Sequence, residues 1–455
     1  MHVDTTRLPP GPRMPGLLQG LRLVTQTTAF FDDGARRWGD TFTIRLPFGA
    51  PIVLVSHPDA VREVFTGADD ALHGGEANGV LGPLLGRNSI LLLDEAAHER
   101  ERRLLLPAFH GERLTAYGEV MEHVTDEVLR EWQPGRRLRT QDEMQRITLD
   151  VILRIVFGAS TPTEVGALRG LLLGWLPSVT SPLLLWPRLQ VDLGRWSPWG
   201  HALALRRRVD AHLREAIARR RRDDAMRGTD VLSTLVEARD ETGAPMRDEQ
   251  IVDEMLTLLV AGHETTATSL SWTVWRLLSE PAVLARARDE AMAGDGTDYL
   301  DATIKETLRL NPIIPDVGRR LTRPMRIGGW DLPAGVAVAP CIYLTHRRPD
   351  VWRDPERFDP ERFLGARPKP YEFFPFGGGV RRCLGMALAL VEMRIVLSRL
   401  LTQVDVRLTP GYRPRLTRRS ITFAPSQGMP VVVTARHEPP RAHHPRPRQA
   451  AAGPG

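Results

Sequence analysis

The sequence predicts a mainly helical protein with a small β region. An apolar pattern with helical spacing runs from about Asp248 to about Ser279, and a second one begins at Met386. Short runs rich in valine, isoleucine and threonine predict strands at residues 41–46, 52–55, 335–339 and 431–434. Length alone would suggest about three domains. However, no flexible linker or internal repeat divides the 455 residues.

Individual helices follow from local patterns. An amphipathic helix is predicted from Arg206 through the arginine run 219–222, whose charges fit a solvated helix face. The helix over 248–279 is too long and too apolar for an ordinary surface helix, so we expect it inside the molecule. The helix through 302–310 is expected to end at Asn311, because Pro312 cannot continue it.

Composition sets further limits. Hydrophobic residues make up 42% of the chain and tryptophan occurs 10 times, which is ample for a large core. Residues 1–7 are predicted to be flexible, and the tail 437–455, rich in Pro, Arg and His, to be disordered. No stretch near the N-terminus approaches ~18 apolar residues, so no membrane anchor is expected, and no signal peptide is recognised. With Cys341 and Cys383 as the only cysteines, a disulfide framework is excluded and a cytoplasmic location is favoured.

A loop rich in glycine and arginine, residues 373–385, presents Cys383. Cysteine binds iron well only as the thiolate, and its free pKa of about 8.5 falls near a metal, a positive charge or a helix N-terminus. The glycines at 377–379 let the backbone turn tightly and approach a flat group closely. The alternative for an isolated cysteine is a buried core side chain after a glycine turn. The whole loop instead predicts a thiolate ligand for a haem iron.

A second pattern, Ala261-Gly-His-Glu-Thr-Thr266, lies within the long helix. Its small residues would let the helix backbone pass close to a cofactor. Glu264 and Thr265 supply a carboxylate and a hydroxyl for delivering protons to dioxygen. The structural alternative is that the threonines only bond back to carbonyls one turn earlier.

Charged residues at three further places indicate a function only when their order along the chain is considered. Glu306 and Arg309 are three apart on one helix face, as any solvated helix could provide. His98 and Arg102 are four apart, and Arg319 follows the helix of Glu306. Taken singly, each is best explained as a surface charge.

Together, these motifs resemble the cytochrome P-450 family. The loop matches F-x-x-G-x-R-x-C-x-G from Phe376 to Gly385, and the oxygen-activating and E-x-x-R patterns precede it in the family's order. The resemblance covers the chain from about Leu8 to Ala435. It implies a single domain over 8–436, a triangular helical prism with haem between the long central helix and the helix after the cysteine loop.

The resemblance also implies roles for individual residues. Cys383 would be the axial thiolate of haem b, favouring O–O cleavage, while Thr265 and Glu264 relay protons to the co-substrate O2. Glu306, Arg309 and Arg362 would form a buried cluster. The propionates would be held by His98, Arg102, Arg319 and Arg381. Further cofactor contacts are expected from Ala261, Phe376, Gly377 and Gly385.

The implied activity is monooxygenation of a C–H bond or C=C bond of a lipophilic molecule, with fatty acids and terpenoids as the leading classes. The alternatives are a peroxide-driven haem-thiolate enzyme, or a haem-binding sensor or carrier without turnover. Asp316 would bind a hydroxyl or amine, or else only local backbone. The predicted pocket residues, mostly apolar, are Leu84, Leu85, Val260, Ile313, Ile314, Asp316, Val317 and Phe423.

The formal charge of +6 and a pI near 9.8 raise the question of a partner. A solvated helix explains the arginine run better than nucleic-acid binding does. The expected partner is a ferredoxin or flavodoxin with its NAD(P)H reductase, docking on a basic surface near the haem. The candidate steering residues are Arg100, Arg103, Arg348 and Arg382. A monomer is expected.

Overall fold

A computed structural model describes residues 8–47, 49–159, 161–179, 190–294, 296–365, 367–419 and 422–438. The predicted flexible residues 1–7 and the tail from 439 lie outside them. The helices are α1 (Gly16–Thr25), α2 (Thr27–Trp38), α3 (Pro58–Thr66), α4 (Gly74–Ala77), α5 (Gly82–Leu85), α6 (Glu95–Leu105), α7 (Glu112–Leu129), α8 (Thr140–Ile155), α9 (Pro162–Val179), α10 (Pro198–Arg222), α11 (Val231–Glu237), α12 (Asp248–Ser279), α13 (Pro281–Ala293), α14 (Asp298–Leu310), α15 (Ile342–Thr345) and α16 (Met386–Gln403). The strands are β1 (Thr41–Ile44), β2 (Ile52–Val55), β3 (Leu72–His73), β4 (Arg137–Arg139), β5 (Arg319–Leu321), β6 (Met325–Ile327), β7 (Trp330–Leu332), β8 (Ala337–Pro340), β9 (Val404–Leu408), β10 (Leu416–Arg419), β11 (Thr422–Pro425) and β12 (Pro430–Arg436).

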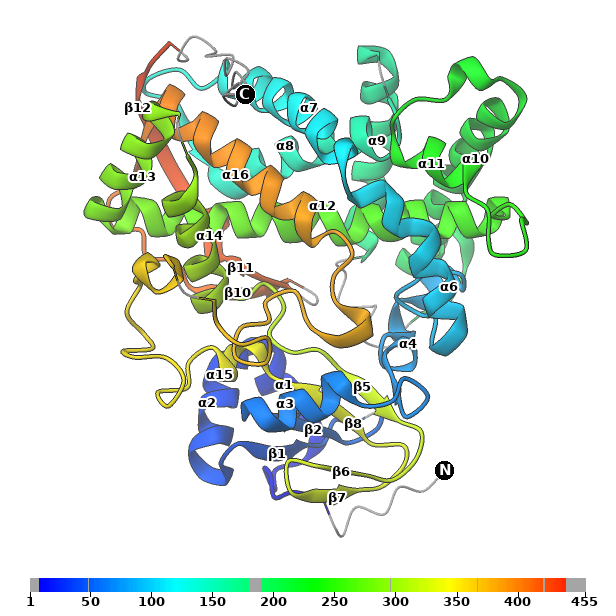
Figure 1. The fold of residues 1–455 in the computed structure, drawn as a ribbon, viewed down its shortest axis with the longest axis vertical. Coiled ribbons are helices and arrows are strands. Elements are labelled where there is room, and N and C mark those ends of the chain that lie inside the picture. The colour runs from blue at the N-terminus through cyan, green and yellow to red at the C-terminus, as the bar shows by residue number, and fades with distance from the viewer. Residues whose placement is uncertain are drawn as a thin grey trace, which may run out of the picture.

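Helix α12 crosses the middle of the molecule (Figure 1). It runs over the predicted range 248–279, and most of its side chains are buried. Two acidic residues in its first turn, Asp248 and Glu249, favour the positive end of the helix dipole. The helix packs against α8, α14 and α16, which explains why its sequence is apolar on nearly every side. The predicted interior position is confirmed.

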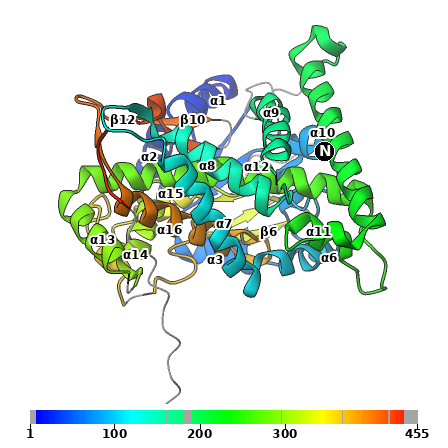
Figure 2. The ribbon, with the colours of Figure 1, turned by 90° about the horizontal axis from the view of Figure 1, so that it is seen from above.

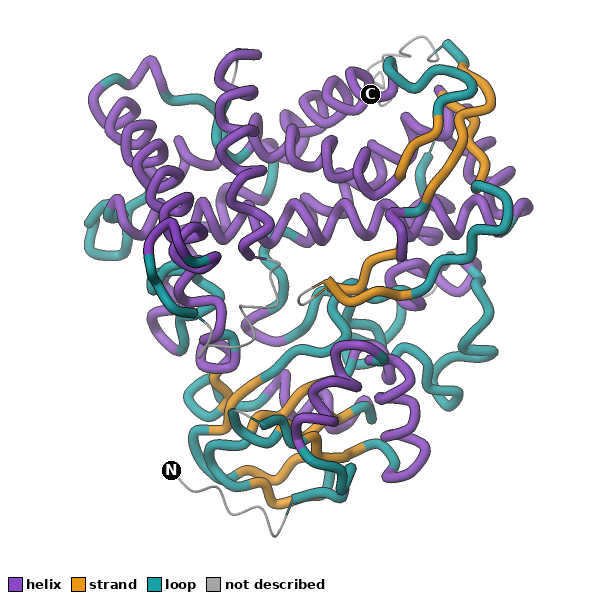
Figure 3. Tube along the Cα trace, turned by 180° about the vertical axis from the view of Figure 1, so that it is seen from behind, coloured by secondary structure: helices purple, strands orange, loops and turns teal. Residues whose placement is uncertain are grey.

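The strands gather in separate places around the helices (Figure 3). The largest sheet has the order β1-β2-β8-β5-β3, with β2 and β8 parallel and the other pairs antiparallel. A second sheet, β4-β12-β9, is antiparallel. The remaining pairs, β6–β7 and β10–β11, are hairpins. The four predicted strand regions are confirmed, with ends shifted by a few residues.

Helix α10 corrects one prediction. It begins at Pro198, earlier than the pattern from Arg206 indicated, because proline suits the first turn and the Ser197 hydroxyl accepts from the Gly200 N–H at 3.0 Å. The arginine run at its end is only partly a solvated face. Arg220 is buried and donates to the Ser233 hydroxyl at 3.1 Å, and the neighbouring arginine donates to a carboxylate of α12.

Two hydrophobic cores lie on either side of the cysteine loop. The larger is built around α12 and includes α7, α8, α10, α11, α14 and α16. The smaller packs α3 and the hairpin β6–β7 against the five-stranded sheet. In Figure 1 the loop that leads into α16 runs between these two parts. The segment that carries Cys383 is therefore placed at the junction of the cores.

Two boundary observations complete the fold. No helix among the described residues is both long enough and apolar enough to cross a membrane.

At the C-terminal end, the His437 N–H donates to the Gln403 carbonyl at 2.8 Å, so ordered structure continues one residue past the predicted boundary at 436.

Candidate active site

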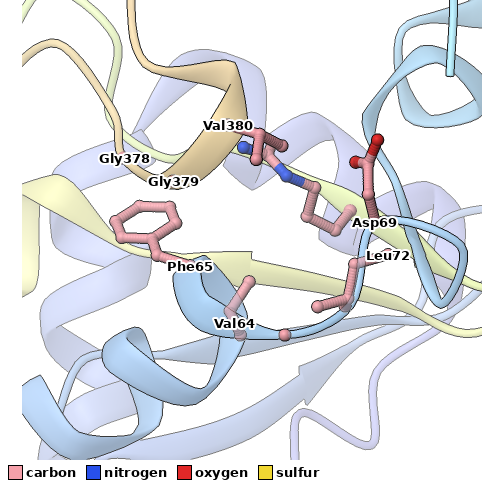
Figure 4. Close-up of a pocket in the computed structure, with 9 residues that line it drawn as sticks. Val64, Phe65, Asp69, Leu72, Gly378, Gly379 and Val380 are labelled. Atoms are coloured by element: carbon pink, nitrogen blue, oxygen red, sulfur yellow. The ribbon is translucent and has the colours of Figure 1, made fainter. Parts of the chain in front are cut away.

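The loop before α16 is closed by its own backbone. The Cys383 N–H donates to the Phe376 carbonyl at 3.0 Å. Gly377 and Gly379 have φ of +68° and +67°, the left-handed region in which a side chain is strained. A Cβ on Gly379 would lie 2.4 Å from the carbonyl oxygen of Phe65. Figure 4 shows the Phe65 ring facing this turn across a small pocket, so the loop is seated directly on α3.

Cys383 lies in a concave site. Its side chain has accessible surface. Even so, burial raises the pKa of its thiol, against the opposing effects of the Gly385 N–H and the Arg102 charge. A side chain that is accessible and yet surrounded by enough protein to raise its pKa lies in a concave part of the surface. It lies neither on the outer face nor in the core. The alternative of a packed core cysteine is wrong for Cys383, whereas Cys341 is fully buried.

The position of α16 bears on the pKa of the Cys383 thiol. The helix begins at Met386 with Gly385 at its N-cap, so Cys383 precedes the first turn. The Gly385 N–H lowers the pKa of the thiol, but burial outweighs it. A metal ion would favour the thiolate further.

The four side chains predicted to hold the propionates, His98, Arg102, Arg319 and Arg381, lie close to one another. His98 is buried on α6, and burial followed by the charges of Arg381, Arg102 and Arg319 lowers its pKa to about 4. Burial and the charge of Arg381 likewise lower the pKa of Arg319 to about 10. The charges of the three arginines all act on His98, and that of Arg381 also acts on Arg319, so the four side chains lie near one another. The structure therefore brings together residues from α6, β5 and the cysteine loop.

These residues fit haem. Its propionates carry negative charge, and an anion placed beside Arg102, Arg319 and Arg381 would stabilise guanidinium groups whose pKa values are lowered by burial. An accessible thiol lies next to the same cations, with Arg102 acting electrostatically on Cys383. On α12, the small residue Ala261 is exposed rather than packed. The site therefore offers a thiolate that can bind iron and arginines that can pair with the two propionates. It also offers a stretch of helix surface, at Ala261, where a flat ring can lie close to the backbone.

Asp94 belongs to the site but was not predicted. Its carboxylate accepts from Arg381 and from the N–H groups of Gly75 and Glu76, at 2.8 and 3.0 Å for the two N–H groups. It therefore fixes the position of Arg381, the arginine of the cysteine loop. Sequence reasoning missed it because a single aspartate before a helix is an ordinary N-cap residue.

Glu264 and Thr265 point away from each other on α12. The Thr265 hydroxyl donates to the Ala261 carbonyl at 2.5 Å, one turn earlier. The Glu264 carboxylate accepts from the Gln145 side chain of α8 at 2.5 Å. Neighbouring helix residues are turned by about 100°, which accounts for the separation. Thr265 thus lies with Ala261, while Glu264 contacts the adjoining helix.

Glu306, Arg309 and Arg362 form one buried cluster. Glu306 and Arg309 are 0% exposed and are joined by two hydrogen bonds of 2.7 and 2.8 Å. Arg362 donates to the same carboxylate at 3.3 Å, and the Asp359 N–H does so at 2.9 Å. Arg309 also donates to the carbonyls of His346 and of two residues in the 355–357 segment. The cluster therefore ties α14 to the chain that precedes the cysteine loop.

The predicted substrate pocket is only partly supported. Leu84, Leu85 and Phe423 are fully buried, so these three present no surface to a substrate. The two leucines pack into the core around α12, and the backbone of Phe423 is held by the Trp272 indole and the Ile313 carbonyl. Ile313 is also buried. The predicted pocket residues that keep accessible surface are Val260, Ile314, Asp316 and Val317.

Asp316 is held in a β-bridge with Cys341. Burial raises the pKa of its carboxyl, and the charge of Arg418 opposes this effect. A cation that acts on this carboxyl is thus supplied by β10.

The segment just before α6 is clamped to α12 by side chains that sequence reasoning did not single out. Asp253 accepts from the backbone and side-chain nitrogens of Asn88 at 3.1 and 2.8 Å. Glu254 accepts from the Ile90 N–H at 2.6 Å. Arg206 of α10 donates to Asp253 at 2.9 Å. Residues of α12, together with Arg206 of α10, therefore fix the chain that leads to Asp94.

A buried carboxyl group outside this site predicts pH-dependent stability. Burial alone raises the pKa of Glu392 on α16 to about 8, from the ordinary value of 4.5. Between these values the folded chain holds a proton that the unfolded chain releases, so the free energy of unfolding falls as pH rises, by about 1.4 kcal/mol per pH unit. Glu392→Gln should flatten this decline in urea unfolding measured across that range. The exposed Glu99→Gln should not, and equal slopes in the two variants would contradict the prediction.

Comparisons with known proteins agree with this geometry. The model of the family described as Cytochrome P450 matches residues 8–430. A Mycobacterium tuberculosis protein named cytochrome P450 135B1 is 41% identical over 446 residues, which cover 94% of this chain and 92% of the relative. Cytochrome P450 135A1 of the same organism is 37% identical, covering 93% and 94%.

Solved structures extend the comparison to the whole fold. Retinoic acid-bound cyanobacterial CYP120A1 superposes with a TM-score of 0.83 at 27% identity, covering 94% of this chain and 99% of that one. The haem domain of cytochrome P450DA gives a TM-score of 0.81 at 25% identity, covering 95% and 98%. The chain therefore belongs to the cytochrome P450 family and is a haem-thiolate monooxygenase.

Proposed function

We propose that this monooxygenase oxidises a C–H or C=C bond of a lipophilic molecule, with a fatty acid or terpenoid as the substrate class. The observation that carries the proposal is a set of apolar side chains with accessible surface: Val260 on α12, next to Ala261, and Ile314 and Val317 in the segment between α14 and β5. The structural neighbour CYP120A1 was solved with retinoic acid, a lipophilic carboxylic acid, which supports the same class.

Each site residue would have its own role in the proposed reaction. Haem, when bound, supplies the iron chemistry that reduces and splits dioxygen. Cys383 would be its axial ligand, and Arg102, Arg319 and Arg381 with His98 would hold its propionates. The Thr265 hydroxyl would pass protons toward the reacting oxygen. Glu264, held by Gln145 on the next helix, would resupply those protons after a change of side-chain rotamer.

The substrate class is tested by titrating the ferric holoprotein with fatty acids, terpenoids, steroids and macrolides while recording the Soret band. A blue shift with one lipophilic class, followed by product formation from the same compound, is the expected result. Faster O2 consumption in the presence of that compound would separate turnover from simple binding. If only polar compounds shift the band, the proposed class is wrong.

Thr265→Ala should separate electron use from product formation. Loss of the hydroxyl removes a proton donor and leaves the helix intact, so the variant should bind haem and substrate normally. NAD(P)H consumption should then end in hydrogen peroxide, with the ratio of product to NAD(P)H falling about 10²-fold or more. The matched control is Thr273→Ala, whose hydroxyl makes the same kind of bond one turn back at 2.9 Å. Unchanged coupling in the Thr265 variant would remove its proposed role.

The electron donor is proposed to be a ferredoxin or flavodoxin with its reductase. Of the predicted steering residues, Arg348 is unsuitable because Asp40 and Asp350 already bind its mostly buried side chain. Arg103 is paired with Glu241 at 2.5 Å. Arg382 is exposed and adjoins Cys383, so it is the best placed of the group.

Arg382→Glu should slow reduction by an acidic donor protein by about tenfold at low salt, and by less at high salt, where screening shortens the reach of charge. Stopped-flow reduction at several ionic strengths measures this effect. Arg353→Glu, which reverses another exposed arginine, is the control. If the two variants behave alike, the surface beside Cys383 is not the docking site.

A further inference from the structure

Two buried carboxyl groups lie where α6 meets the beginning of α12. Glu101 of α6 is 1% exposed and Glu254 of α12 is 0% exposed. The Gln250 amide nitrogen donates to Glu101 Oε2 at 3.3 Å, so the α6 carboxyl lies against the turn of α12 that precedes Glu254. Figure 1 and Figure 2 both place α6 near the same end of α12, opposite the end that leads into α13. The two carboxyls therefore share one buried region.

Each of these carboxyls uses only one of its two oxygens within the described residues. Glu254 Oε1 accepts from the Ile90 N–H at 2.6 Å, and Glu101 Oε2 accepts from Gln250. Glu101 Oε1 and Glu254 Oε2 are buried there without a hydrogen-bond partner. A buried acceptor that lacks a donor is costly to the fold. A donor shared by these two oxygens would therefore stabilise the contact between the helices.

The surrounding charges do not supply that donor. Among the residues that the structure describes, no cation forms an ion pair with either carboxyl. The guanidinium groups of Arg100 and Arg247 act on Glu101, but both side chains are exposed. Asp253 adds negative charge to both carboxyls, and Arg206 of α10 pairs with it at 2.9 Å. The remaining candidate for the donor is a proton on one of the two carboxyls.

Burial keeps protons on the pair. It raises the pKa of Glu101 from the ordinary value of 4.5 to about 7. It also raises the pKa of Glu254 well above 4.5, and the charge of Glu101 adds to this effect. Two interacting carboxyls titrate as a pair, so the last proton leaves only at a pH above the lower of the two values. Because Glu254 Oε1 already accepts from the Ile90 N–H, Glu254 Oε2 is the atom that can carry this proton.

We propose that Glu254 is a positioning residue for the haem-binding side chains of α6, and that its Oε2 donates a shared proton to Oε1 of Glu101. This one bond gives a partner to both unpaired oxygens. Glu101 lies between His98 and Arg102 in the sequence of α6, so the bond fixes the helix where it carries both side chains. The contact with the Ile90 N–H fixes the chain just before α6 at the same time. This role rests on the proposed contacts of His98 and Arg102 with the propionates, and it does not depend on the substrate class.

The shared proton is detected by infrared difference spectroscopy of the holoprotein in H2O and in D2O. Glu254→Gln should remove one band of a protonated carboxyl group. The matched control is Glu249→Gln, which changes an exposed carboxylate of the same helix and should remove no such band. Other buried carboxyls, such as Glu392, are present in both proteins and cancel in the difference.

Transfer of haem from the holoprotein to apomyoglobin measures how firmly α6 is held. In the parent chain the rate should rise about tenfold as pH increases from about 7 to about 10, because loss of the last proton replaces the bond with repulsion between two anions. Glu254→Gln should remove most of that rise, since an amide accepts from the Ile90 N–H and donates to Glu101 at every pH. Glu254→Leu should lose haem about tenfold faster than the parent chain at both pH values.

Three results would overturn the proposal: Glu254→Gln removes no carboxyl band, it leaves the pH dependence of haem transfer unchanged, or it loses haem as fast as Glu254→Leu. Arg102→Gln tests the proposed role of α6 separately. It should lose haem faster than the parent chain at every pH. If it does not, while the Glu254 band is present, the contact of α6 with haem is wrong and the shared proton stands. Circular dichroism of each variant checks that the fold is kept.

Discussion

Cys383→Ser should abolish turnover and change the spectroscopic identity of the haem. The loop geometry would survive, because the bond between the residue 383 N–H and the Phe376 carbonyl involves only backbone. The hydroxyl of serine does not ionise at neutral pH and cannot replace a thiolate. Loss of partners that merely orient a metal ligand costs about 10- to 100-fold in activity or affinity, so loss of the ligand itself should cost more. The carbon monoxide difference spectrum of the reduced protein measures this directly.

The control for this prediction is Cys341→Ser, which changes the other cysteine, buried near Asp316. It should keep the thiolate spectrum and lose only stability, because a hydroxyl is placed in an apolar site. If the Cys383 variant kept the parent spectrum and activity, the assignment of the iron ligand would be wrong.

Glu306→Ala should yield protein without haem. The substitution leaves the buried Arg309 guanidinium without its carboxylate and also removes an acceptor from Arg362 and from the Asp359 N–H. Removing one partner of a buried ion pair costs about 3–5 kcal/mol, a large part of the stability of an ordinary domain. The chain between α14 and the cysteine loop should therefore lose its order. Haem content per chain and thermal unfolding measure the effect.

A surface ion pair provides the matched control. Glu361 is exposed and pairs with Arg286, so Glu361→Ala should change stability by less than about 1 kcal/mol and leave haem content intact. If Glu306→Ala took up haem normally, the buried cluster would not be needed to hold the loop.

Features whose residues are contiguous in the chain could be predicted from the sequence. The bounds of α12 and the turn before Cys383 follow from periodicity and glycine placement, which act over a few residues. Burial of Leu84, Leu85 and Phe423 could not be predicted in the same way. It is decided by helices far away in the chain, so an apolar residue at a pocket position was indistinguishable from a core residue.

The group of His98, Arg102, Arg319 and Arg381 was also only partly predictable from the sequence. Its arginines and histidine were predicted through the resemblance, whereas Asp94 was not, because its significance arises only when Arg381 is brought beside it. The arginine run ending α10 was misinterpreted for a similar reason. Nothing in four consecutive arginines reveals that Arg220 faces the Ser233 hydroxyl inside the fold.

The clamp on the segment before α6 also bears on the order in which the chain folds. Its contacts join residues about 165 positions apart, such as Asn88 with Asp253. A contact of such sequence separation forms after the elements it joins are in place, because closing so long a loop is entropically costly. The segment should thus be among the last to order and the first to open in local unfolding. The amide hydrogen of Ile90 should therefore exchange faster than those in the middle of α12, although both are buried.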